Sequence, residues 1–129
     1  MELKTGIVGK KEMMVTDEIT AKQVGSGELL VLSTPYLAAL MEGAAMEAVK
    51  DCLSCEETTV GSKLSLSHVS ATPVTMRVWA EAELVELDRR RLSFNVKAYD
   101  EAGLIGEGTH ERFIVFKDKF MAKANDKIK

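Results

Sequence analysis

The residue in this sequence that most suggests chemistry is Glu42, the lone carboxylate between Pro35 and Met46, where every other residue is apolar, glycine or proline. An unpaired carboxylate is expensive to bury, so it usually gains a partner or its pKa rises. Such perturbed carboxylates concentrate at catalytic sites, where they act as nucleophiles or as general bases. The alternative is that Glu42 lies on the one solvated edge of its helix, and the sequence leaves both interpretations open.

The chain has two histidines, and the first of them, His68, ends a segment in which polar and apolar residues alternate. Alternation groups His68 with the apolar residues, so its side chain is expected to point toward the helix that carries Glu42. A neutral imidazole in that position can accept or donate a proton near neutral pH. A core histidine bonded to a backbone carbonyl is the alternative interpretation.

The second histidine, His110, shares one face of its alternating segment with Arg112. Gly106 and Gly108 lie on the same face, which allows a helix or a ligand to approach the backbone closely. Two uses of Arg112 are equally consistent with this position. It can hold a phosphate or polarise a carbonyl group, or it can form an ion pair with a buried acid such as Glu42.

These side chains depend on a helix that is expected to begin at Thr34-Pro35 and to run to about Leu53. Threonine is a good N-cap, and proline suits the first helical position. The segment is rich in alanine and apolar nearly all round, which is typical of a helix enclosed by the rest of the protein. Thr34 precedes Glu42 by eight residues, which is about 12 Å along a helix axis. The two side chains therefore cannot touch within one helix, although a substrate lying along it can touch both.

The remainder of the chain has the pattern of antiparallel strands. A first strand is expected within 11–20, and after Gly61 period-two alternation marks four more segments, 63–68, 74–87, 90–100 and 111–115. Residues 117–129 are expected to form a short terminal helix or a frayed tail. This order predicts an α+β fold in which an antiparallel sheet wraps around one long central helix. The long strands cannot cover such a helix alone, so we expect a dimer.

Composition limits the other possibilities. The 129 residues, 46% of them hydrophobic, predict one domain that spans 1–129. The net charge of −3 is far from the strongly basic surface that nucleic-acid binding requires. No apolar run approaches the roughly 20 residues of a membrane span. No signal pattern is present in the first residues, so a cytoplasmic protein with no membrane partner is expected.

The two cysteines, Cys52 and Cys55, form a Cys-x-x-Cys motif. One such pair supplies only two of the four ligands of a structural zinc site, and the sequence has no second pair. A redox role is disfavoured because the pair follows a helix, whereas reactive thiols gain from a helix N-terminus. No metal or redox cofactor is therefore implied, and two thiols fit a reducing compartment.

Two segments carry a resemblance to a known family. They are Ser67-His-Val-Ser-Ala-Thr-Pro73 and Gly108-Thr-His-Glu-Arg112, and they are preceded by Thr34, Glu42 and Gly61. Together these residues resemble the fluoroacetyl-CoA thioesterase group of hotdog-fold proteins. The resemblance runs from roughly residue 34 to residue 128 and is strongest in 67–73 and 106–113.

The resemblance implies a hotdog domain, a homodimer or a dimer of dimers with active sites at the protomer interface, and hydrolysis of an acyl-CoA thioester. By the same resemblance, Thr34, Glu42 and His68 match the catalytic residues of the family. Gly61 and Arg112 match its positions near the substrate. Glu42 would then be the nucleophile or general base, assisted by His68 and Thr34. The alternative function is a hotdog module that binds acyl-CoA without hydrolysing it.

The segment before Thr34 departs from the family. The fluoroacetyl-specific enzyme has phenylalanines there, which form a lid over the acyl pocket, whereas residues 24–33 of this chain contain no aromatic residue. Leu29, Leu30 and Leu32 can line a pocket in their place. A short or medium acyl-CoA is therefore the expected substrate.

Overall fold

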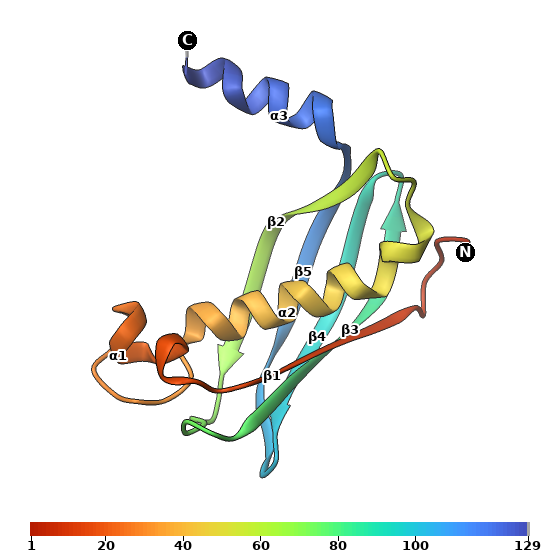
Figure 1. Ribbon diagram of the computed structural model, residues 1–129. Coiled ribbons are helices and arrows are strands. Elements are labelled where there is room, and N and C mark those ends of the chain that lie inside the picture. The colour runs from red at the N-terminus through yellow and green to blue at the C-terminus, as the bar shows by residue number, and fades with distance from the viewer. Residues whose placement is uncertain (129) are drawn as a thin grey trace.

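The computed structural model describes residues 1–128, and its centre is an antiparallel sheet of five strands that curls around one long helix (Figure 1). The strands are β1 (Val8–Met14), β2 (Glu57–His68), β3 (Arg77–Asp88), β4 (Arg91–Asp100) and β5 (Gly103–Phe116). The helices and 3₁₀ turns are η1 (Asp17–Ile19), α1 (Ala21–Val24), α2 (Thr34–Val49), η2 (Lys50–Cys52), α3 (Lys117–Asn125) and η3 (Asp126–Ile128). This arrangement confirms the expected α+β architecture, with α2 as the central helix.

The sheet order is β1-β3-β4-β5-β2, so β1 and β2 are its edge strands. In the ladder between β2 and β5, Gly61 pairs with Arg112 and Lys63 pairs with Glu111, which leaves Ser62 as an extra residue in β2. The Ser62 hydroxyl donates to the carbonyl oxygen of Glu111 at 3.2 Å. A bulge of this kind bends a strand and increases its twist. Here it lies where β2 passes the middle of α2.

The core fills the space between the concave face of the sheet and one face of α2. Alternate residues of β3 and β4 are buried there, as their period-two pattern predicts: Val78, Ala80, Ala82, Leu84, Leu92, Phe94, Val96 and Ala98. On β1, a Cβ at Gly9 would lie 2.3 Å from backbone atoms of Ala44 and Ala48. Only glycine therefore lets the edge strand approach the helix this closely.

The helix differs from the sequence-based expectation in its length and its surroundings. It ends at Val49 and continues only as the 3₁₀ turn η2, so it does not run as a regular helix to Leu53. Its outer face is open within one chain, since Tyr36 is 40% exposed and Met46 is 46% exposed. The expectation of a fully enclosed helix is therefore wrong for the single chain.

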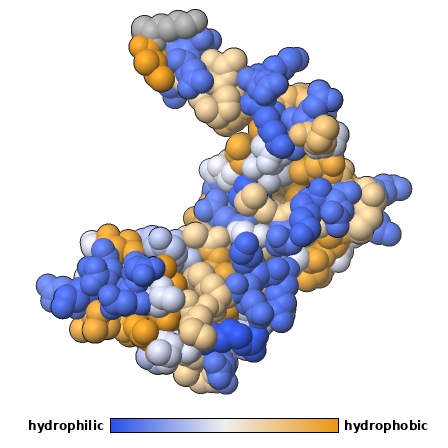
Figure 2. All heavy atoms as spheres, viewed as in Figure 1, coloured by the Kyte–Doolittle hydropathy of each residue, from blue (hydrophilic) through white to orange (hydrophobic). Residues whose placement is uncertain are grey.

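The C-terminal helix α3 stands apart from the sheet. None of its residues is buried, and it projects as an arm from the body of the molecule (Figures 1 and 2). It forms within the expected segment 117–129, of which Lys129 lies outside the described residues. The expected first strand begins earlier than position 11, at Val8, and ends at Met14. No helix among residues 1–128 is long and apolar enough to cross a membrane.

Candidate functional site

Thr34 and His68 meet at the N-terminal end of α2. The N-cap is Ser33, whose hydroxyl accepts from the backbone N–H of Tyr36 at 3.3 Å, so the expected cap role of Thr34 is wrong. Thr34 is instead the first residue of the helix, so its hydroxyl is not used as the helix cap. Thr34 Oγ1 lies 2.8 Å from Nδ1 of His68, at the end of β2. The fold thus joins two of the predicted site residues in one hydrogen bond, the Thr34–His68 pair.

The other ring nitrogen of His68 differs from the first. Nε2 is buried and makes no hydrogen bond to any of the described residues. Burial lowers the pKa of His68 below its ordinary value, and the Ser70 backbone acts in the opposite direction. The imidazole is therefore neutral near neutral pH, with one nitrogen on a hydroxyl and one unused. A buried polar atom left unsatisfied is costly, and such atoms often serve a function.

The Thr34–His68 pair borders a cavity of about 280 Å³. The cavity lies between the loop that precedes α2 and the end of β2, and its walls are Ala21, Ser26, Val31, Leu32, Val69, Ser70 and Ala71. Of the three leucines expected to line a pocket, only Leu32 does so. Leu29 and Leu30 are 69% and 51% exposed, so that part of the expectation is wrong for the single chain.

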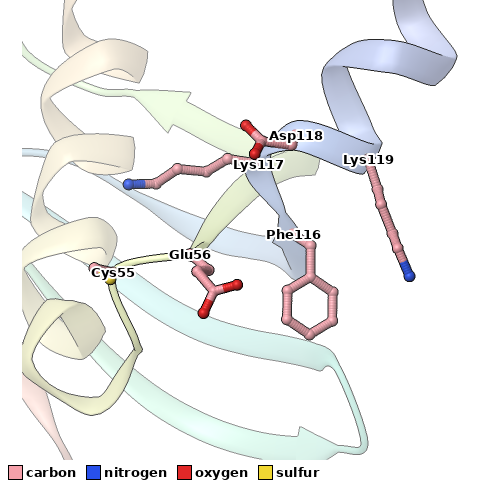
Figure 3. Close-up of a pocket in the computed structure, with 6 residues that line it drawn as sticks. All are labelled: Cys55, Glu56, Phe116, Lys117, Asp118 and Lys119. Carbon is pink, nitrogen blue, oxygen red and sulfur yellow. The ribbon is translucent and has the colours of Figure 1, made fainter.

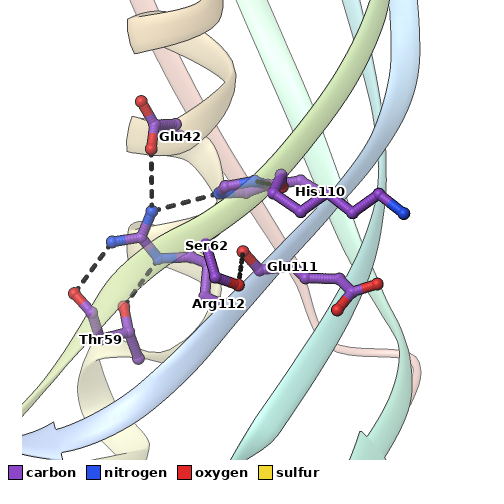
Figure 4. Close-up of polar contacts among 7 residues, drawn as sticks. Glu42, Thr59, Ser62, His110, Glu111 and Arg112 are labelled. Atoms are coloured by element: carbon purple, nitrogen blue, oxygen red, sulfur yellow. Dashed lines mark hydrogen bonds and ion pairs between the residues drawn. The ribbon is translucent and has the colours of Figure 1, made fainter.

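Glu42 lies farther along α2, where its carboxylate faces Arg112 of β5 (Figure 4). Arg112 Nη1 is 3.4 Å from Glu42 Oε2, so the ion pair that was one of two uses considered for Arg112 is formed. The Glu42 side chain is 42% exposed, whereas that of Arg112 is only 5% exposed. Glu42 is therefore not the buried, unpaired acid that its apolar surroundings suggest. It lies on the open edge of α2 with a cationic partner.

Arg112 is held from three directions. Its Nε donates to Thr59 Oγ1 at 2.8 Å, and its Nη2 donates to the Thr59 carbonyl oxygen at 2.9 Å. Its Nη1 lies 3.1 Å from His110 Nε2 and also faces Glu42. Burial lowers the pKa of Arg112, and the Glu42 carboxylate opposes that effect. We call Glu42, Thr59, His110 and Arg112 the Arg112 cluster.

Gly61 makes room for the acid. A Cβ at this position would lie 2.5 Å from Glu42 Oε2, 3.2 Å from Arg112 Nη1 and 3.3 Å from His110 Cε1. Any other residue at position 61 would therefore displace the carboxylate or its partners. Gly61 thus lies directly beside the predicted acid, on the strand that also ends at His68.

The structure brings the five predicted residues to one side of the sheet but divides them into two groups. Thr34 and His68 form one group, and Glu42, Gly61 and Arg112 form the other. Two members of the Arg112 cluster were not among the predicted site residues. The alternation that places His110 on the same face as Arg112 could have identified His110. Nothing in the sequence distinguishes Thr59 from any other threonine in a strand.

A second cavity, of about 430 Å³, lies between the start of β2 and the start of α3 (Figure 3). Its walls are Cys55, Glu56, Phe116, Lys117, Asp118 and Lys119. The ammonium groups of Lys117 and Lys119 point in opposite directions, so they do not converge on one anion. Two acids share the walls, and none of the predicted site residues is present. The residues described contain no group of three or more acids, cysteines or histidines placed to hold a metal ion.

The curled sheet around α2 places this chain among the hotdog-fold proteins. A solved hot-dog-like protein from Thermanaerovibrio acidaminovorans matches it with a TM-score of 0.87, over 98% of this chain and 94% of that chain. The two sequences are 17% identical, so this likeness concerns the fold alone.

The family is given by the sequence. The model of the fluoroacetyl-CoA-specific thioesterase family matches residues 15–118, and the chain belongs to that family. The fluoroacetyl-CoA thioesterase of Streptantibioticus cattleyicolor is 38% identical over 97 residues, which cover 75% of this chain and 70% of that protein. A solved fluoroacetyl-CoA thioesterase has a TM-score of 0.91 and 32% identity, with 98% of each chain covered. The expected fold, family and class of activity, a thioester hydrolase, are thereby confirmed.

Proposed function

We propose that this chain is an acyl-CoA thioesterase that hydrolyses a short or medium acyl-CoA to the free acid and CoA. Its relatives support the reaction, because fluoroacetyl-CoA is itself an acyl-CoA thioester. The observation that carries the proposal is the 2.8 Å contact of Thr34 with His68, on the same side of the sheet as Glu42. A hydroxyl, an imidazole with an unused nitrogen and a carboxylate are the groups that this hydrolysis needs.

In the proposed reaction, Glu42 is the nucleophile or the general base. A thioester carbonyl is electrophilic, and its thiolate leaving group needs little protonation, so the difficult step is attack on the carbonyl carbon. Glu42 attacks that carbon or removes a proton from an attacking water. His68 relays the proton, and the Thr34 hydroxyl donates to the developing oxyanion. Because Thr34 begins a helix, negative charge beside it is further stabilised.

Gly61 and Arg112 are proposed to border the acyl group. Gly61, which has no side chain, lets the Glu42 carboxylate lie directly against β2, and Arg112 supplies a fixed positive charge next to it. The apolar residues Val31 and Leu32 in the cavity at Thr34 suit a short or medium chain. Residues 24–33 contain no aromatic side chain, so fluoroacetyl selectivity is not part of the proposal.

We further propose that the chain acts as a homodimer of one-domain protomers in the cytoplasm. The open edge of β2 and the exposed Tyr36 and Met46 of α2 support a partner on this side. A second protomer there can bring its own Glu42 toward the Thr34–His68 pair. Both cysteines are free thiols, which suits a reducing compartment. Light scattering on the purified chain should give twice the mass of one protomer, or four times that mass for a dimer of dimers.

The first experiment measures the release of free CoA thiol from a panel of acyl-CoAs, from acetyl through fluoroacetyl and aromatic to octanoyl. Glu42→Ala is measured in parallel. Turnover of at least one substrate that is lost in the variant supports the proposal and identifies the acyl class. A folded chain that binds acyl-CoA without turnover would instead be the non-catalytic binding module.

A further inference from the structure

His110 is a buried titratable side chain beside the proposed site that the proposed reaction does not use. It is 2% exposed and lies on β5 between the helix and the sheet. Its Nδ1 is 2.8 Å from the carbonyl oxygen of Lys63, the residue that follows the bulge in β2. Its Nε2 is 3.1 Å from Arg112 Nη1. Both ring nitrogens therefore have partners, unlike those of His68.

These two contacts determine the protonation state of the ring. A carbonyl oxygen can only accept a hydrogen bond, so Nδ1 of His110 must carry a hydrogen. A guanidinium can only donate, so Nε2 must present its lone pair. His110 is therefore the neutral imidazole with its hydrogen on Nδ1. An imidazolium would turn a donor toward Arg112, and the opposite tautomer would break both bonds.

The surroundings of His110 favour the neutral form. The charged groups that face it are Arg112 on its own strand and Glu42 on α2; from β2 it meets the Lys63 carbonyl, and from β4 the ring of Phe94. Burial is the main cause that lowers the pKa of His110, and Arg112 lowers it further, while the Lys63 carbonyl and Glu42 act in the opposite direction. The ring is thus an acceptor throughout the neutral pH range.

We propose that His110 is a positioning residue, which accepts a hydrogen bond from Arg112 and thereby fixes the guanidinium against the carboxylate of Glu42. The proposal rests on the proposed function, in which Glu42 reacts with the substrate. Nη1 of Arg112 bonds both to His110 and to Glu42, so the direction of one bond constrains the other. Thr59 holds the far side of the guanidinium, but it makes no contact with Nη1. Because the guanidinium is planar, these Thr59 contacts fix its plane, and His110 adds the acceptor that holds Nη1 at the edge facing Glu42.

The tautomer can be tested without any turnover. The chain has only two histidines, so ¹H–¹⁵N correlation spectra of the imidazole rings contain two sets of signals, which His68→Ala and His110→Gln assign. We expect His110 in the wild-type chain to be neutral with its hydrogen on Nδ1 at neutral pH. It should stay in that form when the pH is lowered to somewhat below the ordinary histidine pKa. An imidazolium at neutral pH, or a hydrogen on Nε2, would overturn the proposal.

Kinetics test whether the bond acts on the reaction. Glutamine can offer one acceptor to Arg112 and one donor to Lys63, whereas alanine offers neither. With a substrate that the wild type hydrolyses, His110→Ala should lower kcat about tenfold to a hundredfold, the effect of a lost hydrogen bond to a charged group. KM should change much less, and His110→Gln should restore most of kcat. Equal losses in the two variants would contradict the proposal.

A control separates positioning from simple destabilisation. Val96→Ala on β4 removes buried apolar atoms but no polar group, since Val96 is 1% exposed and pairs with Gly108. At a matched loss of thermal stability, Val96→Ala should keep kcat, and a loss as large as that of His110→Ala would overturn the proposal. A wild-type chain without turnover would refute the proposed function instead, and the tautomer measurement would still decide whether His110 holds Arg112.

Discussion

The two ends of the candidate site are built differently. At the first turn of α2, Thr34 and His68 share one hydrogen bond beside a cavity, and His68 Nε2 has no hydrogen-bond partner within residues 1–128. About two turns farther along α2, beside Glu42, Arg112 of β5 makes hydrogen bonds through all three nitrogens of its guanidinium. The first region can change partners at low cost, whereas the second holds its geometry. A site that must both bind a changing substrate and keep an acid in place needs one region of each kind.

The largest expected effect on turnover concerns Glu42, the acid of the Arg112 cluster. Glu42→Gln keeps an oxygen that can accept from Arg112, so the fold should remain intact. Turnover should fall at least about a hundredfold, because an amide is neither a nucleophile nor a base. Acyl-CoA hydrolysis and thermal melting measure the two quantities. Glu47→Gln, which changes an exposed acid of the same helix paired with Lys50, should keep full activity.

Changes at the Thr34–His68 pair should lower activity as much as changes at Glu42 do, but they should have little effect on stability. His68→Ala removes the proton relay and should lower turnover at least about a hundredfold. It removes the 2.8 Å contact with Thr34 at the exposed start of α2, so the melting temperature should change little. Thr34→Ser, which keeps the hydroxyl, should retain far more activity than Thr34→Ala. Wild-type-like turnover in His68→Ala would remove that residue from the mechanism.

The free energy of unfolding should respond most strongly to substitutions in the Arg112 cluster. Arg112→Met removes the buried charge but leaves the Thr59 side chain and the lone pair of His110 without their donor. Each unsatisfied buried group costs about 1–3 kcal/mol, so the free energy of unfolding should fall by several kcal/mol. Urea denaturation measures it. A decrease in the free energy of unfolding of less than about 1 kcal/mol would show that the Arg112 cluster contributes little to stability.

Mild acid should lower the free energy of unfolding, because both histidines are held in their neutral form in the folded chain. Burial lowers the pKa of His68 and of His110 below the ordinary 6.5, so each binds a proton more readily in the unfolded chain. Stability contributed in this way is complete above that value and falls as the pH drops below it. The free energy of unfolding, measured by urea titration at a series of pH values from neutral downward, should decrease. His110→Gln should make that decrease shallower.

The smallest effect is expected far from both regions. Replacing Cys52 and Cys55 with serine changes one half-buried and one exposed thiol beyond the end of α2, and neither lines the cavity at Thr34. Turnover should therefore stay close to that of the wild type. A large loss in the acyl-CoA assay would give the thiols a role that the rest of the site does not require.

Glu42 and His68 could be singled out as candidates from sequence because each breaks the pattern around it, one as a carboxylate in an apolar helix and one as a histidine on the apolar face of a strand. The cap could not be assigned correctly, since Ser33 and Thr34 are adjacent and both suit the position. The sequence also left open whether Glu42 is buried or lies on a solvated edge of its helix, and the structure favours the second. A helix that is apolar nearly all round does not indicate which of its faces turns from the sheet. The role of Thr59 depends on register between β2 and β5, which the sequence does not specify.

The edge position of β2 has a consequence for amide hydrogen exchange. Along an edge strand, alternate N–H groups bond to the neighbouring strand and the others face away from it. In a lone chain, β2 should therefore show slow and fast exchange at alternate residues, with the slow ones bonded to β5. Two β2 strands paired in a dimer would protect both sets over the length of their contact. The exchange pattern of β2 should then mark, residue by residue, where a second chain begins and ends.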